Sequence, residues 1–80
     1  MPENIVMYGA DWCGDCRRSK AFLERHGVAF TYVDLEERPE EMKTVIARNG
    51  GLRSIPVIVF DDGSHLTEPT NGALATKLGL

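Results

Sequence analysis

The feature that most constrains this 80-residue chain is the cysteine pair in the stretch DWCGDC, residues 11–16. Cys13 and Cys16 are the only cysteines of the sequence, and two residues separate them. A short apolar run at 4–8 comes before them and is typical of a strand buried on both faces. Residues 14–27 follow, with good helix formers, apolar side chains at helical spacing and a terminal glycine. The pair therefore lies where a strand leads into a helix.

The remaining patterns complete the expected order of elements. β-branched and aromatic residues predict a second strand at 29–34, and a second helix is predicted at 38–51. A third strand at 56–60, a tight-turn signal and a returning strand at 64–67 predict a hairpin, and a short helix at 70–80 closes the chain. The order β-α-β-α-β-β-α predicts an α/β fold with a mixed four-stranded sheet flanked by helices. This is the smallest form of the thioredoxin fold.

The charge and hydropathy of the chain exclude several classes of function. The net charge is −3 and no basic stripe follows the sequence, so we expect no nucleic-acid partner. No apolar run approaches the roughly 20 residues that cross a bilayer, and the first residues lack the pattern of a signal peptide. We therefore expect a cytoplasmic protein with no membrane partner. In the cytoplasm a close cysteine pair is more often catalytic or metal-binding than a structural disulfide.

The spacing of the cysteines favours redox chemistry. Unpaired N–H groups and a partial positive charge at a helix N-terminus stabilise a thiolate at Cys13, so we expect Cys13 to be the nucleophile. Cys16, one turn further on, would be the more buried resolving thiol, and exchange would pass through a mixed disulfide. The carboxylate of Asp15 opposes this stabilisation, to an extent that depends on where the nearby basic side chains point.

Other interpretations of the pair have less support. A zinc site usually takes four ligands, and only His26 and His65, far apart in sequence, could join the cysteines, so we predict no metal site. A disulfide that closes so short a loop adds little stability. A zinc- or iron–sulfur-binding module would contain metal when purified. A pure protein-docking module would keep its activity after Cys13→Ser.

The stretch LRSIPV, residues 52–57, predicts the second part of the site. Pro56 stands just before an apolar strand, and in a thioredoxin fold the Ile55–Pro56 bond is cis and lies opposite the cysteines. The backbone of Ile55 would then face the sulfur of Cys13 and could pair with an extended substrate. The alternative is an ordinary trans proline at the start of a strand.

Three stretches together, WCGDC, NGGLRSIP and DGSHLTEP, resemble the glutaredoxins and most of all the mycoredoxins of actinobacteria. The resemblance spans nearly the whole chain and implies one glutaredoxin-like domain, residues 1–80, that acts as a monomeric thiol–disulfide oxidoreductase. It implies that the substrates are S-thiolated proteins, and that the reaction reduces the mixed disulfide between such a protein and mycothiol, the small thiol of those organisms. Cys13 would take up the mycothiol, a second mycothiol would release it, and Cys16 would serve a slower or alternative two-thiol route.

The resemblance also indicates the source of electrons. They would come from the small thiol, by way of mycothiol disulfide reductase and NADPH, with no tightly bound cofactor. Glutaredoxins that use glutathione carry Gly-Gly-x-Asp-Asp after the last strand, where this chain has TEPTNG, so glutathione is less favoured. A related redoxin is reduced by thioredoxin reductase and donates electrons to ribonucleotide reductase. It carries Trp-Ser-Gly-Phe-Arg-Pro near its C-terminus, where this chain has LTEPTNGAL. That redoxin is the alternative interpretation. Asp15 is a further departure, because the families have an aromatic residue there.

Further residues are predicted to bind the protein substrate or the small thiol. Trp12 would offer a flat apolar surface beside Cys13, unless it packs as a partly buried side chain. Arg53 would meet a carboxylate of the ligand or of the substrate, unless it is simply an exposed loop arginine. The predicted binding set is Trp12, Arg53, Ser54, Ile55, Pro56, Thr67 and Glu68.

Overall fold

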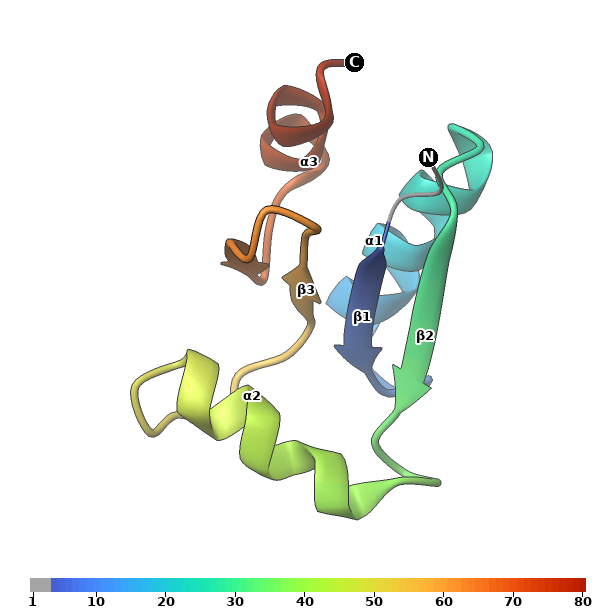
Figure 1. Ribbon diagram of the computed structural model, residues 1–80. Helices are drawn as coiled ribbons and strands as arrows, with labels where there is room; N and C mark the ends of the chain where they lie inside the picture. The colour runs from blue at the N-terminus through green and yellow to red at the C-terminus, as the bar shows by residue number, and fades with distance from the viewer. Residues whose placement is uncertain (1–3) are drawn as a thin grey trace.

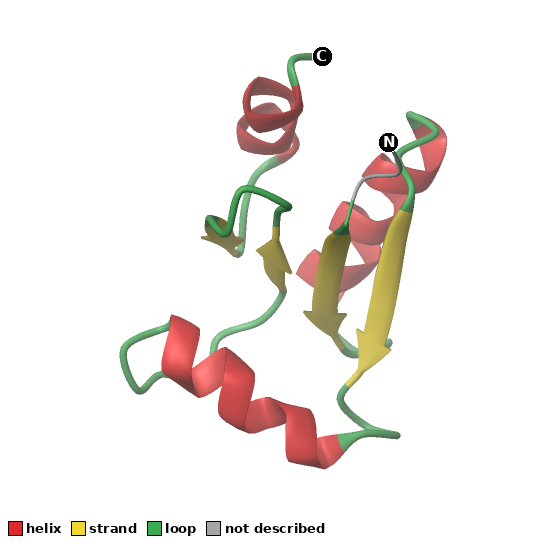
Figure 2. Ribbon diagram, viewed as in Figure 1, coloured by secondary structure: helices red, strands yellow, loops and turns green. Residues whose placement is uncertain are grey.

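The centre of the structure is a mixed four-stranded sheet in the order β2-β1-β3-β4, seen in a computed structural model that describes residues 4–80 (Figures 1 and 2). β1 (Ile5–Gly9) pairs in parallel with β2 (Phe30–Asp34). β3 (Val57–Val59) runs antiparallel to β1 and to β4 (His65–Thr67). The element order and the mixed sheet confirm the predicted thioredoxin-like architecture.

Helices cover both faces of this sheet. α1 (Gly14–Arg25) and α3 (Asn71–Leu78) pack together on one face, and α2 (Met42–Arg48) covers the other face (Figure 1). The predicted second helix ends at the glycine pair 50–51, as expected, but its start is wrong. Its first turn is a 3-10 turn, η1 (Pro39–Glu41), and α2 ends before the glycine pair at 50–51, whose positive φ angles suit glycine alone.

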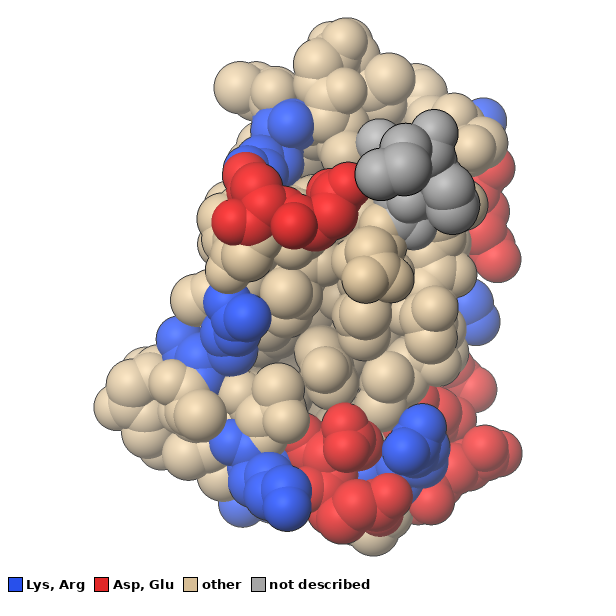
Figure 3. All heavy atoms as spheres, viewed as in Figure 1, with Lys and Arg blue, Asp and Glu red and all other residues tan. Residues whose placement is uncertain are grey.

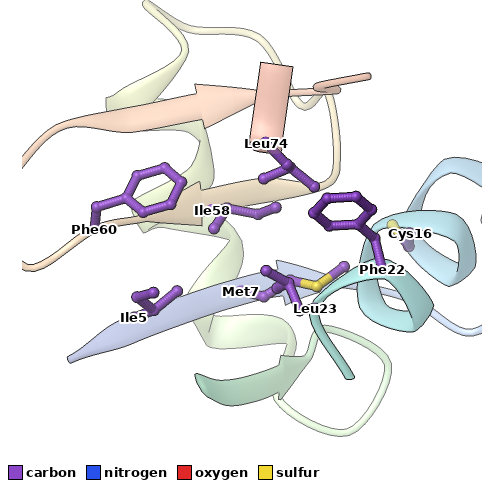
Figure 4. Close-up of a cluster of buried hydrophobic side chains, with 8 residues drawn as sticks. All are labelled: Ile5, Met7, Cys16, Phe22, Leu23, Ile58, Phe60 and Leu74. Carbon is purple, nitrogen blue, oxygen red and sulfur yellow. The ribbon is translucent and has the colours of Figure 1, made fainter. Parts of the chain in front are cut away.

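The larger core cluster holds α1 and α3 against the sheet. Ile5 and Met7 of β1 belong to this cluster together with Phe22 and Leu23 of α1 and Leu74 of α3 (Figure 4). These side chains are buried, and burying a large apolar side chain stabilises a fold by about 1.5–3 kcal/mol. The helix that carries the cysteines is therefore fixed firmly to β1.

The cluster on the opposite face is smaller, and it is formed by Leu35, Val45 and Val57. As a result, β1 alternates between buried and half-buried residues, whereas its apolar run predicted burial on both faces. His26 is the exposed C-cap residue of α1, and its ring lies tilted against that of Phe22, with the ring centroids 4.4 Å apart.

Charged side chains of both signs lie close together on the face drawn in Figure 3. Two of the ion pairs in the structure join Lys77 Nζ to Asp62 Oδ2 at 2.7 Å and Arg38 Nε to Glu40 Oε2 at 3.6 Å. Within residues 4–80, every helix is too short or too polar to cross a bilayer.

Candidate redox site

Cys13 ends the turn between β1 and α1, Cys16 lies in the first turn of α1, and both are free thiols. The N–H of Cys13 donates to the carbonyl of Ala10 at 3.1 Å, and Cys13 is the N-cap of α1. The Cys13 sulfur accepts a hydrogen bond from the N–H of Cys16 at 3.3 Å, so it satisfies an otherwise unpaired N–H of the first helical turn. A negative charge on this sulfur is stabilised by that hydrogen bond and by the helix dipole.

Cys16 occupies a very different environment. It is 1% exposed and packs in the main core beside Phe22 (Figure 4). Burial raises the pKa of the Cys16 thiol to about 12, and its hydrogen bond with Cys13 adds to the rise. Cys16 is therefore protonated at neutral pH, while Cys13 is partly exposed at the surface. The pair combines one accessible sulfur with one buried, neutral thiol.

Gly9 makes room for the buried thiol. A Cβ atom at this position would lie 2.9 Å from the Cys16 sulfur and 3.2 Å from its Cβ. Sequence reasoning treated Gly9 only as the end of the first strand, because no local pattern reports which side chain will pack over a strand end. The absence of a side chain at Gly9 lets the first turn of α1 lie directly on β1.

The loop before β3 faces the exposed sulfur. The Ile55–Pro56 bond is cis, and the Cys13 sulfur lies 4.0 Å from the carbonyl oxygen of Ile55, as the sequence predicted. The carbonyl of Pro56 accepts a hydrogen bond of 2.9 Å from the N–H of Glu68. The loop is thereby tied to the segment that follows β4.

A pocket of about 210 Å³ opens beside the cysteine turn. Its walls include Trp12 and Ile55, together with Arg53, Glu36 and Met42. Trp12 is 68% exposed, so it is a surface side chain and does not pack in the core. The pocket offers an aromatic surface, a cation and an anion within one small space.

The other predicted binding residues are placed differently. Pro56 is buried, and Thr67 is the last residue of β4, where the predicted returning strand at 64–67 also ends. Glu68 is exposed, with a left-handed φ of 48°. Neither Thr67 nor Glu68 lines the pocket that brings together Trp12, Arg53 and Ile55.

Asn49 is a residue that sequence reasoning missed. Its Nδ2 donates to the carbonyl of Ser54 at 2.8 Å, and its Oδ1 accepts from the hydroxyl of Thr67 at 2.6 Å. This one amide therefore joins the end of α2, the loop before the cis-proline and the end of β4. An amide just before two glycines at a helix end was the available signal, but its two partners are tertiary contacts.

Most charged side chains around the cysteine turn have a polar or aromatic partner, and Asp15 and Arg18 form an ion pair. Arg18 Nη1 lies 2.9 Å from Asp15 Oδ1, and Arg18 Nη2 donates to the carbonyl of Pro69 at 3.0 Å. Arg17 Nη1 donates to the carbonyl of Asp11 at 2.8 Å, and the Asp11 carboxylate accepts from the hydroxyl of Tyr32 at 3.2 Å.

Lys20 lies over the ring of Tyr32, at 4.3 Å from its centroid. Burial and the nearby Asp11 raise the pKa of the Tyr32 hydroxyl, so Tyr32 is neutral near pH 7. Among residues 4–80, His, Cys, Asp and Glu side chains do not come together in groups of three or more that could hold a metal ion.

Comparison with known proteins identifies the family. The glutaredoxin family model matches residues 5–66, which is more than half of the chain. The chain belongs to the glutaredoxin family. This glutaredoxin is a thiol–disulfide oxidoreductase, and its buried and exposed thiols suit that chemistry.

Its relatives include proteins of actinobacteria. The chain is 36% identical over 74 residues to a Mycobacterium tuberculosis protein provisionally named a glutaredoxin, a match that covers 92% of this chain and 88% of that protein. It is 29% identical to Mycoredoxin 1 of Corynebacterium glutamicum, over 95% of this chain and 94% of the relative. The crystal structure of a glutaredoxin from Archaeoglobus fulgidus superposes with a TM-score of 0.79 at 30% identity and covers 92% of this chain and 84% of that one.

Proposed function

We propose that this glutaredoxin reduces mixed disulfides between proteins and mycothiol in the cytoplasm, with Cys13 as the nucleophile. The observation that carries this proposal is the environment of the Cys13 sulfur. It caps a helix, accepts the N–H of Cys16 at 3.3 Å and lies 4.0 Å from the carbonyl of Ile55. An extended substrate that paired with the Ile55 backbone would hold its disulfide next to this sulfur.

The proposed reaction has two exchange steps. The Cys13 thiolate attacks the sulfur that belongs to mycothiol, the disulfide to the protein breaks, and the protein leaves as a thiolate that takes up a proton. Cys13 is then joined to mycothiol through a disulfide. The thiolate of a second mycothiol attacks the sulfur of the bound mycothiol, which releases mycothiol disulfide and restores the Cys13 thiolate. Each cycle consumes one free mycothiol, and the other half of the mycothiol disulfide comes from the mixed disulfide itself.

Cys16 is proposed to serve a slower, two-thiol route. As a thiolate it could attack the sulfur of Cys13 and displace the bound mycothiol. Its pKa of about 12 leaves very little thiolate at neutral pH, and the thiolate is the attacking species. Free mycothiol in the solvent therefore has the advantage in the second step.

The pocket beside Cys13 supports mycothiol as the small thiol. Mycothiol carries two polyhydroxylated rings, and such rings stack on aromatic faces and hydrogen bond to charged side chains. Trp12 supplies the aromatic face, and Arg53 and Glu36 supply the charges. Mycoredoxin 1 is also among the relatives that match most of the chain.

The other predicted binding residues lie in or next to the cis-proline loop, and we propose that they form the part of the substrate site opposite the pocket. Ser54 and Pro56 shape the loop that carries Ile55, and the Glu68 N–H bond to Pro56 holds that loop in place. We assign Thr67 and Glu68 to this part of the site, where Thr67 acts through its bond to Asn49.

A comparison of three reductants tests the proposal. One protein–mycothiol mixed disulfide is incubated with the glutaredoxin and either mycothiol with its disulfide reductase, glutathione with its reductase, or thioredoxin reductase, each with NADPH. We expect turnover with mycothiol, loss of turnover in Cys13→Ser, and retained turnover in Cys16→Ser. Turnover with the glutathione system but not with the mycothiol system would exclude mycothiol as the small thiol.

A second candidate is a redoxin that receives electrons directly from thioredoxin reductase. The chain is 34% identical over 58 residues to a glutaredoxin-like protein NrdH of Lactococcus lactis, a match that covers 72% of this chain and 78% of that protein. Turnover only with thioredoxin reductase, abolished in both Cys13→Ser and Cys16→Ser, would favour this candidate, because direct transfer to a protein disulfide uses both thiols.

A further inference from the structure

A carboxylate stands between the two cysteines, where a negative charge opposes a thiolate. Asp15 lies in the first turn of α1, and its side chain is 45% exposed. The only basic group paired with it among residues 4–80 is Arg18, at 2.9 Å. Arg18 follows at the i+3 position, so the two side chains are neighbours on one helix face.

The guanidinium of Arg18 is held by a second partner. While Nη1 meets Asp15, Nη2 donates to the backbone carbonyl of Pro69 at 3.0 Å. Pro69 is buried and follows Glu68, whose N–H holds the carbonyl of Pro56. An isolated exposed ion pair is mobile and weak, but the carbonyl of a buried residue fixes one end of this arginine.

We propose that Arg18 is a positioning residue that cancels the field of Asp15 at the Cys13 sulfur and thereby keeps that sulfur reactive. Asp15 supplies a negative charge near the first turn of the helix, Arg18 supplies a positive charge, and the Pro69 carbonyl keeps the two together. The inference rests on the proposed function, because it takes Cys13 as the nucleophile.

The other charged side chains near the turn have partners other than Asp15. Arg17 donates to the Asp11 carbonyl, and Lys20 lies over the Tyr32 ring. The carboxylate of Asp11 accepts a hydrogen bond from the hydroxyl of Tyr32. Arg53 and Glu36 line the pocket beside Trp12. Arg18 is thus the basic side chain placed to compensate Asp15.

The test measures the alkylation of Cys13 by iodoacetamide from pH 5 to pH 9, with the modified site located by mass spectrometry. Four proteins are compared: the natural chain, Arg18→Ala, Asp15→Asn and the double variant. On the acid side of the profile, where the rate follows the thiolate fraction, we expect Arg18→Ala to react about two- to fivefold more slowly. We expect Asp15→Asn to react faster by a similar factor, and the double variant to react within about twofold of the natural chain.

Arg25→Ala is the matched control, because it removes the same charge from the same helix. Arg25 lies in the last turn of α1, over the ring of Phe22 and at the far end from the cysteines. Its alkylation profile should stay within about 1.5-fold of the natural one, because charges more than a Debye length apart are screened.

Two results would overturn the inference. Arg18→Ala could leave the rate unchanged, or the double variant could remain as slow as Arg18→Ala, which would mean that the arginine acts only through structure. Failure of the proposed function looks different: Cys13 would not be the site modified in the natural chain, or Cys13→Ser would keep its turnover.

Discussion

A methyl group at Gly9 tests how closely the buried thiol lies against β1. In Gly9→Ala the new Cβ would be placed 2.9 Å from the Cys16 sulfur and 3.2 Å from the Cys16 Cβ. Carbon and sulfur do not approach that closely without displacement. The Cys16 sulfur and Cβ cannot move far, because both lie close to the backbone of α1. Overpacking in a close-packed core costs about 1–3 kcal/mol. We therefore expect the free energy of unfolding to fall by about 1–3 kcal/mol.

Urea denaturation followed by circular dichroism measures this change. A loss of 1 kcal/mol lowers the Tm of a domain of this size by about 4–8 °C, so thermal melting provides an independent check. Gly14→Ala is the matched control, because a Cβ at Gly14 would meet only Arg17 Nη2, at 3.7 Å. Alanine is favoured over glycine by about 0.5–1 kcal/mol in the middle of a helix and by less at the first residue of α1, so Gly14→Ala should not destabilise the chain.

A double variant locates the clash. If the sulfur is responsible for most of the cost, Gly9→Ala should destabilise the Cys16→Ala protein by less than half as much as it destabilises the natural chain. Equal stability of Gly9→Ala and Gly14→Ala would refute the reasoning, as would an undiminished cost of Gly9→Ala in the Cys16→Ala background.

Three further predictions concern the site. Asn49→Ala removes the hydrogen bonds to Ser54 and Thr67 and should cost about 1–3 kcal/mol in urea denaturation. Asn49→Asp keeps the acceptor for Thr67 but places a second oxygen against the Ser54 carbonyl, so it should cost at least as much at neutral pH, and a smaller cost would contradict the assigned geometry. Asn49→Ala should also raise the KM for a mixed disulfide more than it lowers kcat, because it loosens the loop that carries the substrate-binding backbone; a change in kcat alone would argue against this. The pKa of Cys16 is about 12 in the folded chain and near 9 when unfolded, so its contribution to stability is complete below pH 9 and is lost as the pH rises toward 12. Between these pH values the free energy of unfolding should fall by up to about 1.4 kcal/mol per pH unit. Cys16→Ser should reduce this fall between pH 8.5 and 10, and parallel curves of the free energy of unfolding against pH for the two proteins would exclude the linkage.

The fold could be predicted from sequence because its signals are local. Apolar runs, helical spacing and glycines at turns give the order of elements, and the cysteine pair falls at the strand–helix junction. The start of the second helix was less accurate, because Pro39 and the acidic residues that follow it suit a 3-10 turn as well as an α-helix.

The fine structure of the site depends on contacts that no local pattern contains. Spacing suggests that Arg18 can reach Asp15, but its second partner, Pro69, lies 51 residues away. Asn49 likewise binds Thr67 across 18 residues. Such partners are set by how the elements pack, so sequence reasoning identified the sulfurs and the cis-proline loop but missed the groups that hold them in place.

Trp12 has a practical consequence for studies of this glutaredoxin. It is the only tryptophan of the chain, it is largely solvent-exposed, and it adjoins the Cys13 position. Its fluorescence emission therefore originates from a single indole at the mouth of the pocket. A bound molecule that shields this ring from water will shift the emission to shorter wavelength, so complex formation can be followed in real time without attaching a dye.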